Sequence, residues 1–223
     1  MKLYRIKISS WTASFRYPNI LSGYQPTLEV PPVSTVLGLM NACAGEYLNH
    51  EKLEIGYYFE YGAKEVDLET IYQIERTDKG TPKNEVKSNV IKREFLFDCR
   101  LYVYLSDVAL VTYFKQPYFP LVLGRSSDLA SVELIEEIEL QEIVGAEHIK
   151  GQLVPFKGNF LPGVIQVLSN YFTDEIPRRN IGPEPYSVIS CFGKTGKTNI
   201  KAYRDVIDNS PVDIYLHQLI FEK

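Results

Sequence analysis

Three short motifs in this sequence combine residue types that bind phosphate groups and nucleotide bases. They are an aromatic and polar loop over residues 10–32, a run of small residues after two prolines at 33–45, and a turn at 124–127. Guanidinium forks, hydroxyls, backbone amides and aromatic rings are the groups that bind phosphates and splayed bases. A turn, a helix cap or simple packing would explain each motif alone, but together they favour RNA binding. The residues that carry this signal are Arg16, Tyr17, Ser34, Thr35, Gly38, Gly124, Arg125, Ser126 and Ser127.

A fourth motif, residues 193–198, reads Gly-Lys-Thr-Gly-Lys-Thr and is similar to the end of a nucleotide-binding P-loop. A complete P-loop needs a glycine at position 191, which is Cys191 here, and a helix directly after it whose amides bind phosphate. Residues 199–204 predict at most a short helix. We therefore interpret the stretch as a basic, flexible loop in which Lys194 and Lys197 contact a phosphate backbone, and we expect no nucleotide cofactor.

Residue patterns for catalysis or metal binding are sparse. The histidines His50, His148 and His217 have no neighbouring partner pattern, and the three cysteines are far apart and form no Cys-x-x-Cys pair. The glutamates of residues 133–147 are most simply a solvated acidic face. We therefore predict no metal, no cofactor and no catalytic set. Reduced, buried cysteines are typical of a cytoplasmic protein, and no signal peptide or membrane-spanning run is evident.

The net charge of −4 at pH 7 argues against nucleic acid only until its distribution is considered. Residues 1–28 carry four bases and no acid, residues 178–204 carry six bases and one acid, and residues 133–147 carry six glutamates and no base. Clustering on one face, rather than the total, makes a phosphate-binding surface. We expect the basic stretches to face RNA, and the acidic stretch to point away or to dock on a basic neighbour.

The periodicity predicts an α+β protein. Alternating apolar residues indicate strands, and the spacing of apolar residues over 35–48 indicates a helix with Ser34 or Thr35 as its N-cap. Residues 66–105 read as two long strands joined by a polar, basic tip, and an apolar strand runs into the turn at Gly124. This order suggests a ferredoxin-like or RRM-like sheet. The predicted strands are 2–9, 53–62, 65–76, 91–105, 138–144, 186–192 and 213–221.

Two ordered stretches carry a resemblance to a known family. Residues 15–18 (Phe-Arg-Tyr-Pro) with 25–39, and residues 117–126 (Pro-Tyr-Phe-Pro-Leu-Val-Leu-Gly-Arg-Ser), resemble the two signatures of the Cas5 family, a RAMP subunit of CRISPR-associated complexes. The likeness covers residues 1–130 well and the remainder poorly, and it is greatest to the type I-B group. It implies an RRM-like RAMP domain at 1–130, with a projecting hairpin "thumb" at about 75–100, and a β-rich extension at 131–223 packed on it.

The resemblance also implies a function. The family's members cap the 5′ handle of CRISPR RNA (crRNA) in Cascade, the type I effector complex, and contact its large subunit and its first backbone subunit. Through this complex, the family's members also contact target DNA near its PAM-proximal end. A thumb that binds RNA needs basic side chains, because phosphate contacts carry most of the affinity. The thumb bases are Arg76, Lys83, Lys87, Lys92 and Arg93, and Arg178 and Arg179 add to the C-terminal basic stretch.

One branch of this family, in type I-C systems, cleaves precursor crRNA with a tyrosine, a lysine and a histidine. In this sequence no histidine is preceded by lysine, and residues 113–116 read Tyr-Phe-Lys-Gln. Such cleavage needs a base for the 2′-hydroxyl and an acid for the leaving group. The sequence therefore predicts a non-catalytic binding subunit, with a metal-independent endoribonuclease as the alternative.

Overall fold

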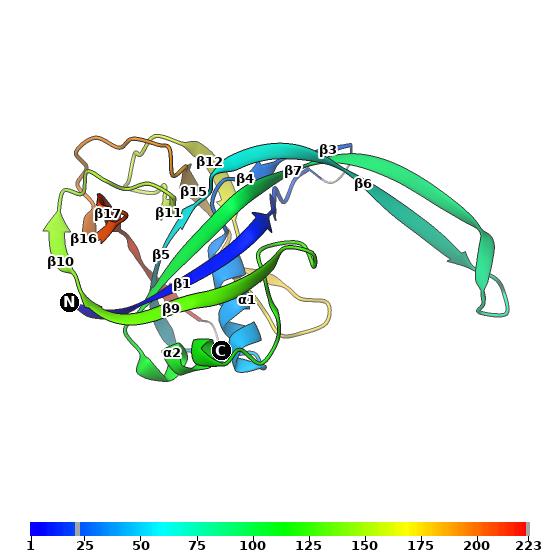
Figure 1. Ribbon diagram of the computed structural model, residues 1–223, viewed down its shortest axis with the longest axis horizontal. Helices are drawn as coiled ribbons and strands as arrows, with labels where there is room; N and C mark the ends of the chain where they lie inside the picture. The colour runs from blue at the N-terminus through cyan, green and yellow to red at the C-terminus, as the bar shows by residue number, and fades with distance from the viewer. Residues whose placement is uncertain (21–22, 222–223) are drawn as a thin grey trace.

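A computed structural model describes residues 1–20 and 23–221 of the chain. Figure 1 shows a rounded body from which one long two-stranded arm projects. The helices and strands of the described part are β1 (Lys2–Ala13), β2 (Phe15–Arg16), β3 (Tyr24–Gln25), β4 (Thr27–Leu28), α1 (Val33–Ala44), β5 (Lys52–Glu60), β6 (Ala63–Arg76), β7 (Pro82–Leu105), α2 (Val108–Lys115), β8 (Leu121–Val122), β9 (Leu129–Glu139), β10 (Gln141–Val144), β11 (Gln152–Pro155), β12 (Val164–Leu168), β13 (Tyr171–Phe172), β14 (Asn180–Ile181), β15 (Glu184–Ile189), β16 (Lys201–Ile207), β17 (Ser210–Ile214) and β18 (Leu216–Ile220).

A large sheet forms the centre of the body, in the order β18-β5-β7-β1-β9-β8, with β3 and β6 also paired to β7. Alternation of apolar and polar residues explains strand β1, because the buried Ile6 and Ile8 alternate with the half-buried Arg5 and Lys7. The sequence predicted only residues 138–144 as strand after the turn, whereas β9 begins at Leu129. Glutamates interrupt the apolar alternation of β9, and these glutamates pair with bases of β1, as described below.

Helix α1 covers one face of this sheet and buries Val36, Leu39, Met40 and Cys43 in the main core. The predicted N-cap at Ser34 or Thr35 is wrong. Pro32 is the N-cap, and its carbonyl accepts hydrogen bonds from the backbone N–H groups of Thr35 (2.9 Å) and Val36 (3.3 Å). The helix therefore begins at Val33, and Ser34 and Thr35 lie in its first turn with their hydroxyls free of a capping role.

A second helix, α2, covers residues 108–115. Asp107 caps this helix, because its Oδ1 accepts a hydrogen bond from the N–H of Ala109 at 2.8 Å.

Smaller sheets cover the other side of the body. The sheet β10-β16-β17 packs its apolar residues against Tyr102 and Tyr104 of β7, and β11-β15-β12 forms a further sheet beside it. The expected boundary near residue 130 lies inside β9, and β18 is an edge strand of the large sheet. Both predicted parts of the chain therefore contribute strands to one sheet.

The arm in Figure 1 is the hairpin of β6 and the first part of β7. Its register runs from Ala63 opposite Phe97 to Arg76 opposite Pro82, and the tip is closed by a hydrogen bond of 2.8 Å from the Thr77 N–H to the Thr81 carbonyl. The hairpin predicted at about 75–100 is longer, because β6 already begins at Ala63, and the strand predicted at 91–105 begins earlier, at Pro82. Pairing with β6 holds this polar stretch, which by composition alone reads as a turn.

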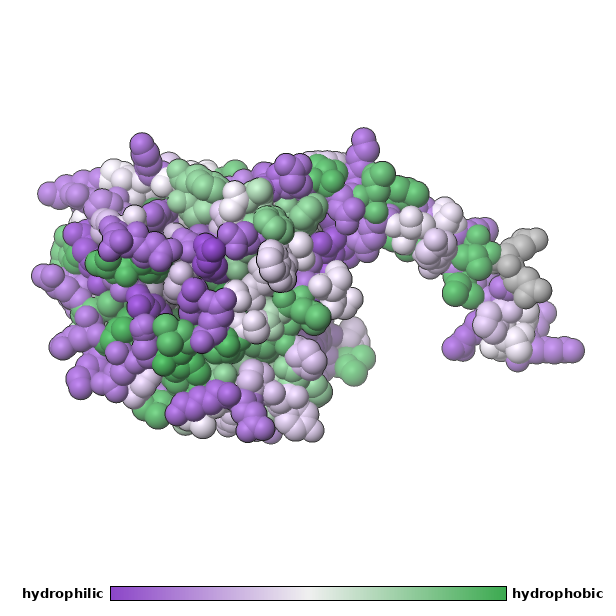
Figure 2. Space-filling view, in the orientation of Figure 1, coloured by the Kyte–Doolittle hydropathy of each residue, from purple (hydrophilic) through white to green (hydrophobic). Residues whose placement is uncertain are grey.

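One face of the arm is apolar and uncovered. Residues opposite each other in the register point to the same side, and Figure 2 shows hydrophobic side chains along the arm. Each of these side chains is at least 49% exposed: Val66, Leu68, Tyr72, Ile74, Val86 and Val90. An exposed apolar face of this length marks a surface that another macromolecule covers.

Candidate nucleic-acid interface

The predicted motifs meet at a cleft of about 510 Å³ on the body. One wall is the loop after β1, a second is the start of α1, a third is the turn at 124–125, and the fourth is the segment 167–183. Five predicted residues line this cleft together: Arg16, Ser34, Thr35, Gly124 and Arg125. The fourth wall was not predicted. Its lining residues are Val167, Leu168, Ser169, Phe172, Asn180 and Pro183.

The turn at Gly124 is held directly against the loop that follows β1. Gly124 has φ +112°, and a Cβ atom there would lie 2.0 Å from the carbonyl oxygen of Ser14. The Ser14 N–H donates to the Leu123 carbonyl at 3.1 Å, which fixes this close approach. Only glycine fits both the backbone angle and the space, so the turn and the loop form one continuous wall of the cleft.

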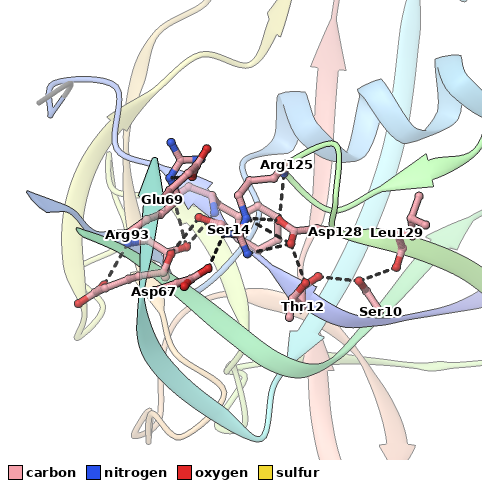
Figure 3. A network of polar contacts seen from close by, with 12 residues as sticks. Ser10, Thr12, Ser14, Asp67, Glu69, Arg93, Arg125, Asp128 and Leu129 are labelled. Atoms are coloured by element: carbon pink, nitrogen blue, oxygen red, sulfur yellow. Dashed lines mark hydrogen bonds and ion pairs between the residues drawn. The ribbon is translucent and has the colours of Figure 1, made fainter. Parts of the chain in front are cut away.

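Asp128 positions the Arg125 side chain (Figure 3). This carboxylate is fully buried and accepts hydrogen bonds from the Arg125 backbone N–H (3.0 Å), from Arg125 Nε (3.1 Å) and Nη2 (3.1 Å), and from the Thr12 hydroxyl (2.6 Å). Sequence reasoning missed Asp128. Its position three residues after an arginine in a glycine turn was the available signal. The guanidinium is therefore oriented before any ligand arrives.

Arg93 connects the cleft to the base of the arm. It forms an ion pair with Glu69, with 2.9 Å between Nε and Oε2, and its side chain is only 3% exposed. Burial, together with the charges of Arg16 and Arg125, lowers its pKa. The prediction that Arg93 contacts RNA is wrong, because RNA cannot reach it. Arg93 instead pairs with the arm, and Arg125 Nη1 lies 3.8 Å from Asp67 of the same arm.

Arg16 differs from these two arginines. Its side chain is exposed at the mouth of the cleft, and it forms no ion pair with any carboxylate in the described residues. Its effect on the pKa of Arg93 places its charge beside the same cluster. Arg16 is therefore the arginine of the cleft that is most available to an incoming phosphate.

Other predicted residues lie around the cleft. Gly38 and Arg178 line a smaller adjoining hollow that shares Ser34 and Phe172 with the cleft, and Ser126 and Ser127 are exposed on the turn. Arg179 lies nearby in the chain but pairs with Glu175, with 2.8 Å between Nε and Oε2. Tyr17, Lys194 and Lys197 line two further hollows described below.

Arg76, Lys83 and Lys87 lie near the tip of the arm, whereas Lys92 lies near its base, opposite Leu68 and beside Tyr24. Lys83 and Lys87 both pair with Glu75, with Nζ to carboxylate distances of 2.8 and 3.0 Å. These exposed pairs are weak and exchange readily. Arg76 and Lys92 are exposed and have no ion pair among the described residues. The arm therefore offers scattered positive charge rather than a single basic cluster.

The basic N-terminal strand is neutralised within the chain. Strands β1 and β9 are antiparallel neighbours, and their side chains pair across the register. The pairs are Lys2–Glu137 at 3.3 Å, Arg5–Glu136 at 3.1 Å and Lys7–Glu133 at 2.7 Å, with Glu142–Lys201 at 2.9 Å beyond them. The expectation that β1 contributes charge to an RNA surface is therefore wrong. The basic neighbour of the acidic stretch is this same chain.

The histidines give no support to catalysis. His217 is 3% exposed and packs against Tyr57, with 5.6 Å between ring centroids, so no RNA hydroxyl can reach it. Burial lowers its pKa to about 4. His50 is half-buried beside Phe221, and burial lowers its pKa as well. His148 lies in a different hollow with the 193–197 loop.

The depressed pKa of His217 predicts a pH-dependent stability. The folded protein keeps this ring neutral, whereas the unfolded chain protonates it below pH 6.5, so the unfolded state gains protons as the pH falls. Between pH 7 and 5 we expect this histidine to remove about 2 kcal/mol from the free energy of unfolding. Urea unfolding at several pH values measures it. The substitution His217→Phe should flatten the profile in this window, and an unchanged profile would contradict the assignment.

No group of metal-ligating side chains that could hold an ion occurs in residues 1–20 and 23–221. None of the described helices has the length and apolar character needed to cross a membrane. The cysteines are free thiols, with Cys43 and Cys99 buried and Cys191 half-buried. Burial raises the pKa of both Cys43 and Cys99 to about 12, which makes these thiols unreactive.

Comparison with known proteins places the chain among CRISPR-associated proteins. Residues 4–177 match the family model described as "CRISPR-associated protein (Cas_Cas5)". A chain of a CRISPR RNA-guided surveillance complex shares the fold with a TM-score of 0.56, 17% identity, and coverage of 88% of this chain and 91% of that one. The prediction of an α+β protein is confirmed.

Two further solved structures are less similar. One is a chain of the type III-B Cmr-beta complex bound to cognate target RNA and AMPPnP (TM-score 0.48, 10% identity, coverage 89% and 86%). The other is a CRISPR protein from Archaeoglobus fulgidus (TM-score 0.46, 12% identity, coverage 96% and 99%). No curated protein matches the sequence.

Proposed function

We propose that this chain, which belongs to the Cas5 family of CRISPR-associated proteins, is a non-catalytic RNA-binding subunit of a type I CRISPR effector complex. In this proposal it binds and caps the 5′ handle of crRNA in the cleft on its body. It bridges to the large subunit and the backbone subunit of Cascade, and it meets target DNA near the PAM-proximal end through that complex. A structural neighbour with a TM-score of 0.56 comes from a CRISPR RNA-guided surveillance complex, which supports this setting.

The observation that carries the proposal is the convergence of the separate motifs on one cleft. Arg16, Ser34 and Arg125 come from three different segments, yet they line the same 510 Å³ space. Arg125 is oriented by Asp128, and the hydroxyls of the first turn of α1 have no capping role. Guanidinium groups and hydroxyls at a helix start suit phosphate and ribose oxygens.

The arm supplies the second part of the proposal. Its apolar face is exposed along much of its length, and the opposite face is polar. In an assembled complex a neighbouring subunit covers the apolar face, and the bases near the tip contact RNA. Residues 1–130 then act as the RRM-like RAMP domain and residues 131–223 as an extension that completes its sheet and its cleft.

Replacing Arg16 by alanine tests the proposal. The full chain should bind a single-stranded RNA of the handle sequence about tenfold more weakly, because an exposed charge-assisted phosphate contact is lost. The dependence of log K on log salt should fall by about 0.7. Electrophoretic or fluorescence titration at several salt concentrations measures both. Arg125→Ala is a less clean test, because it also leaves the buried Asp128 without its partner.

The matched control is Lys115→Ala, which removes an exposed base on α2 that lies outside the cleft. Equal losses for Arg16→Ala and this control would show non-specific charge attraction rather than a site. At the level of the complex, the other Cascade subunits assembling on crRNA with a normal 5′ end in the absence of this chain would contradict handle capping.

The alternative, a metal-independent endoribonuclease, is tested with the same protein. Purified chain is incubated with a labelled repeat RNA in the presence of EDTA. We expect no site-specific cleavage. Cleavage that disappears in His50→Ala would replace the non-catalytic proposal, and the burial of His217 makes His50 and His148 the histidines to test.

A further inference from the structure

The loop at residues 193–198 forms part of a groove that the proposed handle cleft does not include. It leads into β16, a strand, so it has no helix whose N-terminal amides could bind a phosphate as in a P-loop. Thr195 and Thr198 fix it on the neighbouring segment. Thr195 Oγ1 lies 2.9 Å from the Glu147 carbonyl and accepts from the Ile149 N–H at 3.1 Å, and the Thr198 N–H donates to the Ala146 carbonyl at 3.1 Å. These hydrogen bonds tie the loop backbone that carries Lys194 and Lys197 to residues 146–149.

Three lysines gather around this groove of about 550 Å³. Lys150, Lys194 and Lys197 line it, against a single carboxylate, Glu147. None of the three lysines forms an ion pair with a carboxylate of residues 1–20 or 23–221. Most other bases of the body, by contrast, are paired across strands. Three unpaired lysines of the body therefore gather at this one groove.

An exposed aromatic ring lies on the same groove. Phe192 is 66% exposed, and its ring meets Tyr61 at right angles with 5.2 Å between centroids. Tyr61 is buried, so it anchors the ring from one side. An anchored, exposed ring next to free lysines is the arrangement that holds single-stranded nucleic acid, by base stacking and by phosphate contacts.

A third hollow of about 420 Å³ adjoins the groove and lies beside the loop that lines the cleft. Gly193 and Lys194 line both the groove and this hollow, and Tyr17 in the hollow directly follows Arg16 in the cleft. The middle hollow holds Glu29 and Glu94, which lie 3.0 and 4.0 Å from Lys64. Two lysines, Lys64 and Lys194, balance these two carboxylates, and the remaining wall includes Tyr17, Pro162, Val164 and Val188. This hollow, with its balanced charges and apolar wall, suits nucleotide bases. The cationic groove at its end suits phosphates.

We propose that the groove of Lys150, Phe192, Lys194 and Lys197 is a second RNA subsite, occupied by the same single strand that binds the cleft. The strand leaves the cleft past Tyr17, crosses the middle hollow, and places a base against Phe192 and phosphates against the lysines. This inference rests on the proposed function of the cleft. It makes the bound RNA longer than the cleft alone can hold.

The test compares two RNA lengths with the full chain. One oligonucleotide of about 5 nucleotides fills the cleft only, and one of about 14 nucleotides can reach the groove. The variant Lys194→Gln/Lys197→Gln should bind the long RNA at least tenfold more weakly, with a salt slope lower by about 1.4, and should bind the short RNA as the wild type does. The matched control Lys52→Gln/Lys115→Gln removes two exposed lysines outside the groove and should leave both affinities unchanged.

Phe192 is tested by a conservative pair. Phe192→Leu should weaken binding of the long RNA about tenfold, and Phe192→Tyr should restore it, because only a planar ring stacks on a base. Wild-type binding of the long RNA by the lysine variant would overturn the subsite. The subsite would also be overturned if the lysine variant lost affinity for duplex DNA but not for single-stranded RNA. The proposed function fails separately, if Arg16→Ala leaves the short RNA bound as before, and a chain that binds neither RNA overturns both.

Discussion

The variant Asp128→Ala is expected to lower the free energy of unfolding by about 3–5 kcal/mol, because it breaks a buried ion pair by removing one partner. The carboxylate is fully buried and holds the Arg125 guanidinium, the Arg125 backbone N–H and the Thr12 hydroxyl. Without it, these donors lose their acceptor in a dry site. Urea unfolding at neutral pH measures the loss, with Asp78→Ala at the exposed arm tip as the control for removing an aspartate.

A double-mutant cycle separates the pair from the rest of the network. Asp128→Ala/Arg125→Ala should cost about 1–3 kcal/mol less than the sum of the two single variants, because the double variant leaves no unpaired charge. Additive losses would show that Asp128 acts through Thr12 and the backbone alone. In that case Asp128 would not orient Arg125, and the proposal that the cleft binds RNA would lose one of its supporting observations.

The parts of this fold that the sequence could predict are those set by local patterns. The alternation of β1 and β5, the long hairpin and the helix after the two prolines all follow from side-chain periodicity within one element. The cleft residues Arg16, Ser34 and Arg125 were also predicted, because each belongs to a short motif with its own chemistry. Periodicity and motif content do not depend on what lies across the sheet.

The parts that the sequence could not predict depend on partners in other strands and segments of the chain. Glu136 faces Arg5 across 131 positions of the chain, so two opposite charge runs that looked like separate surfaces neutralise each other. Arg93 looked like a basic residue of the thumb, but it is buried against Glu69 of the neighbouring strand β6, at the point where β3 also pairs with β7. The segment 167–183, without a strong motif, closes the cleft only through tertiary packing.

A second buried carboxylate, Asp213, holds together the sheet behind the 193–198 loop. It is fully buried on β17 and accepts from Arg204 Nε at 2.7 Å and from the backbone N–H groups of Glu147 and His148 at 2.9 Å each. Burial alone would raise its pKa. The hydrogen bonds from Arg204, His148 and Glu147 outweigh burial and hold the pKa below its ordinary value.

The variant Asp213→Ala is therefore expected to lose about 3–5 kcal/mol of unfolding free energy at pH 7. The lowered pKa of Asp213 sets how its contribution to the free energy of unfolding changes with pH. The folded state holds the carboxylate ionised, so its contribution is complete above about pH 5 and is lost as the pH falls through the ordinary value near 4 and below. The difference between wild type and variant should thus shrink in acid. The His217 effect lies at higher pH, between 7 and 5, so the two can be separated in one set of urea titrations.

The control Asp174→Ala removes an exposed aspartate and should leave the stability within about 0.5 kcal/mol of the wild type at every pH. A loss for Asp213→Ala that stays constant down to pH 3 would contradict the depressed pKa. Asp213 fixes residues 147 and 148, and Thr195 is hydrogen-bonded to Glu147 and Ile149, so this variant should also displace the loop that carries Lys194 and Lys197. Binding of long RNA should then fall even though no lysine is changed, whereas short RNA, held in the cleft, should be bound as before.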